Sequence, residues 1–116
     1  MRILILEDDN VRVKFFIEKL GQYSPKITEN AEIAISYLKE DTFDYVFLDN
    51  DLGRGNGEGI DVADYLQQNP DNPNCKAAVI VHSWNIPAAN TIKSKFPAAV
   101  ISRYLTDNFL KLVLDI

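Results

Sequence analysis

Short apolar runs alternate along this chain with longer stretches in which apolar residues recur every three or four positions. The short runs are typical of strands that are covered on both faces, whereas the longer spacing is typical of helices with one buried face. The pattern predicts five strands, at Arg2–Leu6, Lys26–Thr28, Tyr45–Leu48, Ala77–Val81 and Ala99–Ile101.

Capping and helix-breaking residues divide the intervening stretches into five helices. Gly21 ends the first helix, Asn30 caps the second and Pro87 lies early in the fourth. The helices cover Val11–Leu20, the residues from Asn30 through Leu38, Gly59–Gln68, Pro87–Phe96 and the residues from Thr106 to Val113. This strict alternation predicts one doubly wound α/β domain over residues 1–116, with a parallel sheet of five strands and five helices.

The spacing also predicts which residues of the first two helices face the sheet. In the first helix these are Val11, Phe15, Phe16, Ile17 and Leu20. In the second helix they are Ile33, Ala34, Tyr37 and Leu38.

Composition excludes several classes of protein. The 116 residues are 47% apolar and 25% charged, which fits one globular domain with a hydrophobic core. No apolar run approaches the roughly 20 residues of a membrane-spanning helix, and we expect no signal peptide because the chain opens directly on a strand pattern. The single cysteine, Cys75, cannot form an internal disulfide and is expected to be inert, so we expect a cytoplasmic protein.

The charge balance bears on partners. The formal net charge is −5, and the twelve basic residues are spread along the chain. Nucleic-acid binding needs a clustered basic face, so we expect no nucleic-acid partner and no membrane partner. An acidic protein instead suits metal cations or a partner with a basic surface.

Polar residues directly follow four of the predicted strands. Ligands of doubly wound sheets bind outside the carboxyl ends of the strands, so these residues form the candidate site. They are Glu7 and Asp8 after the first strand, Asp49 and Asp51 after the third, His82, Ser83 and Asn85 after the fourth, and Arg103 after the fifth.

The acidic residues of this group predict a metal site. Hard cations such as Mg²⁺, or Mn²⁺, prefer carboxylate, carbonyl and water oxygens. Glu7, Asp8 and Asp49 supply carboxylates, and Asn50 or Asp51 adds a backbone carbonyl. The alternative is that acids after strands cap the next helix, which suits Asp9 but not Asp49, since a glycine-rich loop (residues 53–59) follows it. That loop is either a mobile lid or a plain surface loop.

The remaining residues predict contacts to a phosphoryl group. Ser83 and Asn85 could hydrogen-bond its oxygens, and Arg103 could pair with it or with Asp49. His82 could act as acid, base or ligand, or it could turn into the sheet face as a core residue. Arg103 could equally be a solvated side chain.

With these residues placed, the chain resembles the receiver domains of two-component response regulators over essentially its full length. The resemblance rests on Ile3–Asp8 (ILILED), on Tyr45–Leu52 (YVFLDNDL), on Gly59 and on Ser83. It implies the flavodoxin-like receiver fold, a phosphoacceptor aspartate at Asp49, a metal-binding carbonyl at Asp51 and a phosphoryl contact at Ser83. It also implies phosphorylation by a histidine kinase with Mg²⁺ bound.

Three positions depart from the receiver pattern. Arg103-Tyr104 replaces the usual lysine and proline, Gly53 replaces a proline, and Trp84 replaces a small residue. The motifs Leu48–Gly53 (LDNDLG) and His82–Asn85 (HSWN) are similar to a divergent group, the cyclic-phosphate-processing receivers. That similarity implies an enzymatic role on phosphate esters, with His82, Asn85 and Arg103 in the site.

Three functions follow as hypotheses. The first is a stand-alone receiver in phosphorelay signalling, phosphorylated at Asp49 by a histidine kinase and acting through another signalling protein. The second is a metal-dependent phosphoesterase that processes cyclic phosphates, and the third is a degenerate receiver that serves as an interaction module. Signalling would use the face that includes Tyr104 and Leu105. A homodimer could also form through this face.

Overall fold

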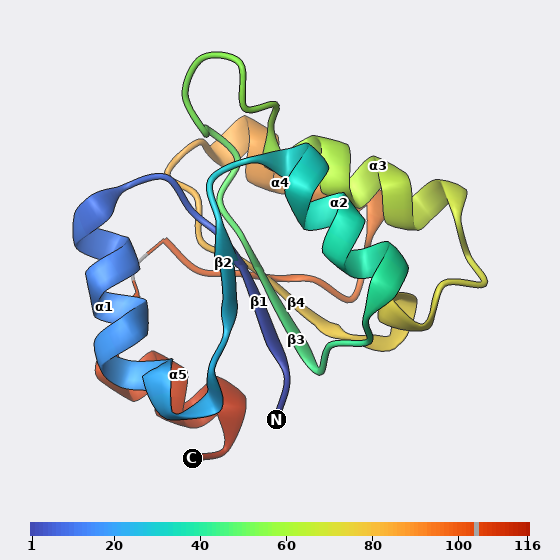
Figure 1. The fold of residues 1–116 in the computed structure, drawn as a ribbon. Helices are drawn as coiled ribbons and strands as arrows, with labels where there is room; N and C mark the ends of the chain where they lie inside the picture. Colours follow the sequence, from blue (N-terminus) through green and yellow to red (C-terminus); the bar gives the residue numbers. More distant parts are fainter. Residues whose placement is uncertain (104) are drawn as a thin grey trace.

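The computed structural model describes residues 1–103 and 105–116, so Tyr104 lies outside the described residues. Five strands form one parallel sheet in the order β2-β1-β3-β4-β5 (Figure 1). They are β1 (Ile3–Leu6), β2 (Lys26–Thr28), β3 (Tyr45–Leu48), β4 (Ala78–Val81) and β5 (Val100–Ile101). The predicted doubly wound receiver fold is therefore confirmed.

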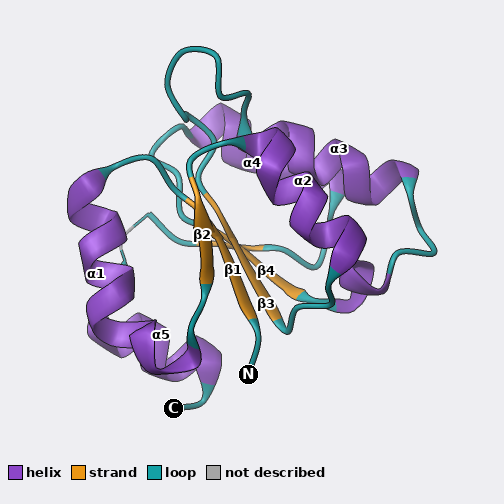
Figure 2. Cartoon of the chain, in the orientation of Figure 1, coloured by secondary structure: helices purple, strands orange, loops and turns teal. Residues whose placement is uncertain are grey.

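Helices cover both faces of the sheet (Figure 2). Two of them, α1 (Asn10–Leu20) and α5 (Asp107–Leu114), lie on one face. The opposite face carries α2 (Ala31–Glu40), α3 (Gly59–Gln68) and α4 (Ile86–Lys95). Two short 3₁₀ helices, Gly21–Tyr23 and Pro73–Lys76, connect elements at the periphery. None of the described helices is long and apolar enough to cross a membrane.

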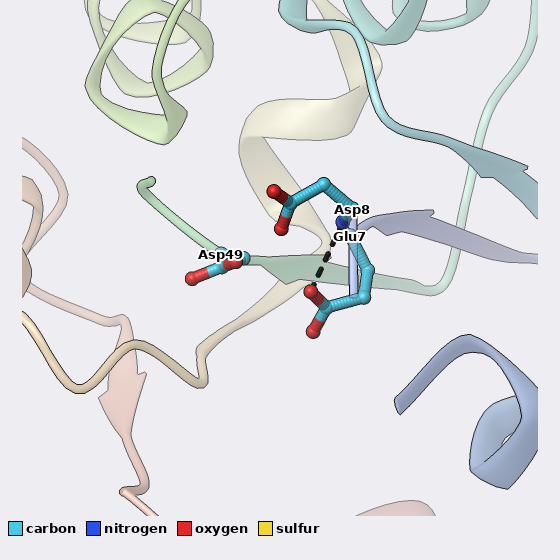
Figure 3. A group of neighbouring side chains, drawn as sticks. All are labelled: Glu7, Asp8 and Asp49. Carbon is cyan, nitrogen blue, oxygen red and sulfur yellow. Dashed lines mark hydrogen bonds between the residues drawn. The ribbon is translucent and has the colours of Figure 1, made fainter. Parts of the chain in front are cut away.

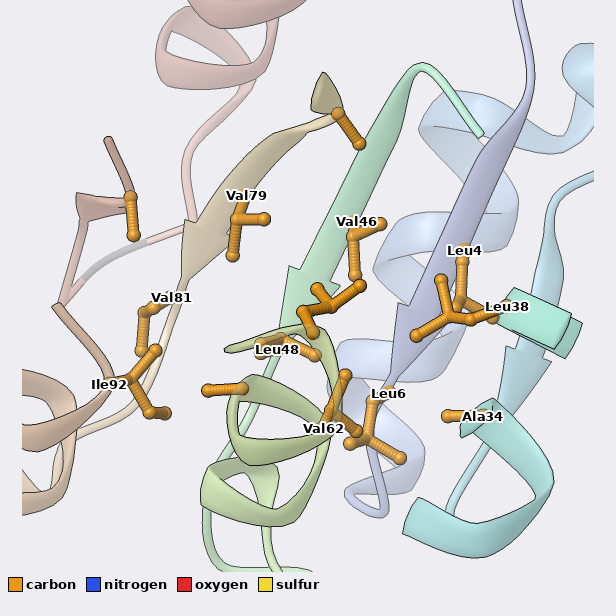
Figure 4. Packing of buried hydrophobic residues seen from close by; sticks show 14 of the residues in the cluster. Leu4, Leu6, Ala34, Leu38, Val46, Leu48, Val62, Val79, Val81 and Ile92 are labelled. Atoms are coloured by element: carbon orange, nitrogen blue, oxygen red, sulfur yellow. The ribbon is translucent and has the colours of Figure 1, made fainter. Parts of the chain in front are cut away.

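Strand alternation divides the core into two layers, because successive side chains point to opposite faces of a sheet. Leu4, Val46 and Val79 pack toward α2, α3 and α4 (Figure 4). Ile5 and Phe47 pack toward α1 and α5. Both faces of β1 and β3 are therefore buried, as their unbroken apolar runs predict.

Three predicted buried positions were wrong. Val11, Ile17 and Ile33 are exposed, with Val11 at 76%. The stripe of α1 that meets the sheet is centred on Phe16 and Leu20. At 100° per residue, Val11 lies about 140° and Ile17 about 100° from Phe16 around the helix, so neither reaches the sheet.

The strand order reverses between β1 and β3, which places their carboxyl ends side by side. From β1 the chain passes to the edge strand β2 and then returns to β3 on the other side of β1. Leu6 pairs with Leu48, and Leu48 pairs with Val81. The residues that directly follow these three strands are thus neighbours at the switch point of the sheet, where such folds bind ligands.

Candidate metal and phosphate site

Alternation continues past the strand ends and brings Glu7, Asp49 and His82 onto the face covered by α1. Ile5, Phe47 and Ile80 face α1 and α5, so the residues two positions later point the same way. The pairing also continues, since the Asp49 amide donates to the Leu6 carbonyl and the His82 amide to the Leu48 carbonyl, each at 3.0 Å. All three side chains are buried.

Arg12 joins this group from the first turn of α1, and sequence reasoning missed it. The side chain of Asp9 caps the helix by accepting from the Arg12 amide at 2.9 Å, as predicted for Asp9. The Arg12 guanidinium donates from Nε to Glu7 Oε1 at 2.6 Å and from Nη2 to Glu7 Oε2 at 3.1 Å. Nη2 also lies 3.5 Å from Asp49 Oδ2.

Glu7 is a fully hydrogen-bonded carboxylate. Besides Arg12, its oxygens meet His82 Nε2 at 2.9 Å and accept from the backbone amides of Asp8 and Asp9 at 3.0 and 3.1 Å. Burial acts to raise its pKa, but the hydrogen bonds of His82 and Arg12 outweigh burial and lower the pKa to about 2. Glu7 is thus ionised and already has partners for both oxygens.

His82 lies inside the protein, as its core alternative expects. Its ring packs edge-on against Phe16, with centroids 5.4 Å apart, and faces Phe47 at 6.3 Å. Burial lowers the pKa of His82 despite the bond to Glu7, so the neutral ring donates from Nε2 to that carboxylate. Its Nδ1 is buried without a hydrogen-bond partner. In this arrangement His82 positions Glu7.

Asp49 is the acid of the group whose ionised form is disfavoured by its surroundings. Its Oδ1 accepts from the Asn50 amide at 2.9 Å. Burial, together with the negative charge of Glu7, raises the pKa of Asp49 to about 8, and Arg12 opposes the rise only in part. A buried carboxyl whose pKa is raised by neighbouring charge gains from a cation close to it.

Asp8 completes a cluster whose donor chemistry fits a divalent cation. One carboxylate oxygen each of Glu7, Asp8 and Asp49 lie within 4.8 Å of one another. Glu7 and Asp8 leave the end of β1 in opposite directions, with Asp49 beside them (Figure 3). Among the described residues, nothing donates a hydrogen bond to the Asp8 carboxylate. Oxygen donors suit Mg²⁺, and Asp8 and Asp49 offer the oxygens that Glu7 does not.

The loops after β3 and β4 are tied together by the amide of Asn85. Its Nδ2 donates to Asp51 Oδ1 at 3.2 Å, and its Oδ1 caps α4 by accepting from the Ala88 amide. Asn50 Nδ2 donates to the same Asp51 oxygen at 3.1 Å. Asn85 and Asp51 therefore hold the two loops in register, and neither Asp51 nor Asn85 belongs to the carboxylate cluster.

Ser83 follows β4 and the glycine-rich loop follows β3, at the same end of the sheet as the cluster. Ser83 is buried, and its hydroxyl accepts from the Asn85 amide at 3.1 Å. In the loop, the Asn56 carbonyl accepts from the Ala31 amide at 2.9 Å. This contact ties the loop to the start of α2, in the manner of an ordered surface loop.

Arg103 is not brought to Asp49. Its side chain is exposed and, among the described residues, the cation within 4 Å of Asp49 is Arg12. Arg103 instead lines a cavity that also reaches Arg12 and Trp84. The predicted signalling face at Leu105 borders that cavity, while Tyr104 lies outside the described residues.

The β2-β1-β3-β4-β5 sheet and the acidic cluster at its switch point define a receiver-type domain. The chain belongs to the family described as the cyclic-phosphate processing receiver domain, which matches residues 2–97. No curated protein matches the chain.

Solved structures with this fold are plentiful. The signal receiver domain of a putative Luxo repressor protein from Vibrio parahaemolyticus has a TM-score of 0.75 at 21% identity, covering 98% of this chain and 86% of that one. The response regulator TrrA from Thermotoga maritima, solved with Mg²⁺-BeF, has a TM-score of 0.71 at 20% identity, covering 98% and 96%. A Burkholderia pseudomallei response regulator with a phosphorylated aspartic acid and a calcium ion has a TM-score of 0.71 at 16% identity, covering 95% and 64%. These likenesses show the fold.

Proposed function

We propose that this domain is a metal-dependent enzyme that opens cyclic phosphates to phosphomonoesters. The observation that carries the proposal is the combination of an acidic cluster and a basic cavity that meet at Arg12, which contacts Asp49 and lines the cavity. The description of its family, cyclic-phosphate processing, names the same chemistry. A site for a phosphate ester needs both a place for the phosphate and room for its organic group.

The roles follow from the contacts. Asp8 and Asp49 would hold the cation, which when bound would neutralise charge on the phosphate oxygens. The Arg12 guanidinium uses Nε and Nη2 on Glu7, which fixes its plane and leaves the other N–H groups for a phosphate oxygen. In the reaction, water adds to phosphorus, one ester P–O bond breaks, and the leaving oxygen takes a proton, which yields a phosphomonoester.

The test is turnover of 2′,3′-cyclic AMP with and without Mg²⁺. We expect product with Mg²⁺, loss of activity with a chelator, and a loss of at least about 100-fold in Asp8→Asn. Asp9→Asn is the matched control, because it removes the neighbouring charge and keeps a residue that caps α1 equally well. Equal turnover by Asp8→Asn and Asp9→Asn would refute the metal role of Asp8.

Phosphorylation of Asp49 is the second candidate function. It is favoured by the position of buried Asp49 directly after β3, next to the strand β4 that leads to buried Ser83, and by the fold shared with phosphorylated response regulators. A histidine kinase would be the phosphoryl donor and another signalling protein the recipient of the signal. Acetyl phosphate with Mg²⁺ would then give a phosphoryl adduct that is absent from Asp49→Asn.

A further inference from the structure

A cavity of about 360 Å³ opens between the first half of α1, the end of β4 and the segment that joins β5 to α5. Its charged lining residues are Arg12 and Arg103, and Val11, Phe15 and Leu105 give it apolar walls. Trp84, which is 67% exposed, forms a further wall after β4. The volume lies within the range of about 300–1,000 Å³ that is usual for small-molecule pockets.

The side chains that line the cavity indicate what kind of ligand it would bind. None of the described lining residues is acidic, although the whole chain carries a net charge of −5. Two guanidinium groups among aromatic and aliphatic side chains suit an anion that also carries an apolar group. Guanidinium groups stack on flat rings as well as pairing with phosphate, so a planar ring fits these walls better than a flexible chain does.

Arg12 connects the cavity to the acidic cluster. Its Nη2 lies 3.5 Å from Asp49 Oδ2, and the same side chain forms part of the cavity wall. Its side chain is 35% exposed, so it can meet a ligand without leaving Glu7. A phosphate held at Asp8, Asp49 and Arg12 would therefore direct its organic substituent toward Phe15, Trp84 and Arg103.

We propose that this cavity binds the organic part of the substrate and selects cyclic phosphates whose alcohol carries a planar ring, that is, nucleoside cyclic phosphates. This inference rests on the proposed function, which places the phosphate at Asp8, Asp49 and Arg12. It assigns Arg103 to substrate binding at the ring or its substituents, away from Asp49.

The experiment compares two substrates that differ in the ring, 2′,3′-cyclic AMP and glycerol 1,2-cyclic phosphate. Loss of one charge-assisted contact corresponds to roughly tenfold in affinity. We expect Arg103→Ala and Trp84→Ala each to raise KM for the nucleotide about tenfold, with kcat within about twofold. KM for the glycerol compound should stay within about twofold.

Matched controls exist for both variants. Arg54→Ala removes an exposed arginine of the glycine-rich loop, and Leu112→Ala removes an apolar side chain that is 82% exposed on α5. Neither should change KM for either substrate. Equal KM values for the nucleotide in wild type, Arg103→Ala and Trp84→Ala would show that the cavity does not bind the organic part of the substrate. The proposed activity would not be affected by that result.

Calorimetry tests ligand binding by the cavity independently of turnover. If neither substrate is turned over, the proposed function fails, and titration of adenosine 5′-monophosphate against glycerol phosphate, with Mg²⁺ present, still tests the cavity. The inference is supported if wild type binds the nucleotide about tenfold more tightly than glycerol phosphate. This preference should be lost in Arg103→Ala and Trp84→Ala and kept in Arg54→Ala and Leu112→Ala. Equal binding of the two ligands contradicts it.

Discussion

At the scale of single residues, the positive charge beside Asp49 comes from the start of α1. The resemblance to receivers implies a lysine after the fifth strand, where this chain has Arg103. In the structure Arg103 lines the cavity, and Arg12 contacts both Glu7 and Asp49. One guanidinium thus compensates two buried carboxyl groups, and it supplies the charge that would also meet a phosphate.

Replacement of Arg12 tests this compensation. Arg12→Ala leaves Glu7 buried with only His82 and two backbone amides, and we expect a loss of about 2 kcal/mol in the free energy of unfolding. This figure is below the usual cost of breaking a buried pair because the Arg12 side chain is 35% exposed. Urea denaturation measures the change. Lys14→Ala, an exposed basic residue of the same helix, is the control, and equal stability of the two variants would contradict the account.

The raised pKa of Asp49 predicts how stability depends on pH in the metal-free protein. The native carboxyl titrates at about 8, whereas its ordinary value is 3.8, so the folded state holds a proton that the unfolded state has lost. The free energy of unfolding should therefore fall as pH rises from about 5 to 8. The lowered pKa of Glu7 acts in the opposite direction but only below about pH 5, so it does not mask the slope.

Asp49→Asn removes that slope. The excess stability of the variant over wild type should grow by on the order of 1 kcal/mol for each pH unit from about pH 5 to 8, because the unfolded carboxyl, with its ordinary pKa of 3.8, is already ionised over this range. Urea denaturation at several pH values in the presence of a chelator measures both curves. Parallel curves across pH 5 to 8 would mean that Asp49 ionises normally.

At the scale of elements, the site depends on how closely α3 approaches the end of β3. Gly59 begins α3, and its amide donates to the Asn50 carbonyl at 3.1 Å. A Cβ at this position would overlap the backbone carbonyl of Asp49. The absence of a side chain at Gly59 therefore fixes where the backbone of Asp49 lies.

Gly59→Ala should move this backbone and cost about 1–3 kcal/mol of stability. Activity should fall as well, because Asp49 shifts with the carbonyl. Gly21→Ala is the control, since Gly21 has a helical φ of −56° and a Cβ there would make only an ordinary contact with Ile17. Thermal unfolding of the two variants provides the comparison, and an unchanged Gly59→Ala protein would refute the close approach.

The elements also show what could be predicted from the sequence. Unbroken apolar runs identified the strands, and capping residues such as Asn30 and Thr106 identified the helix starts. The acidic cluster was predicted from the positions of its residues directly after the first and third predicted strands. Arg12 was missed although it lies four residues before Phe16, on the same stripe of α1. A charged residue is expected to be exposed to solvent unless the position of its carboxylate partner is known. The partners of His82 and Asn85 depend on three-dimensional packing in the same way.

At the scale of the whole molecule, an acidic protein keeps a basic cavity next to its acidic cluster. The net charge of −5 would repel phosphate esters at long range, so binding depends on the local charge of Arg12 and Arg103 and on a cation at Asp8 and Asp49. The switch point of the sheet places both features at one end of β1 and β3. The fold thus brings together a site for the phosphate and a site for its substituent.

The most direct test of the central claim is one mass-spectrometric measurement of wild type and Asp49→Asn with Mg²⁺ and 2′,3′-cyclic AMP. Intact protein mass and nucleotide products are followed in the same samples, with acetyl phosphate in a parallel reaction. The account predicts a nucleoside phosphomonoester from wild type and its loss in Asp49→Asn. Wild type that leaves the cyclic nucleotide untouched, while acetyl phosphate adds a phosphoryl group at Asp49, would contradict the account and identify the domain as a phosphoacceptor.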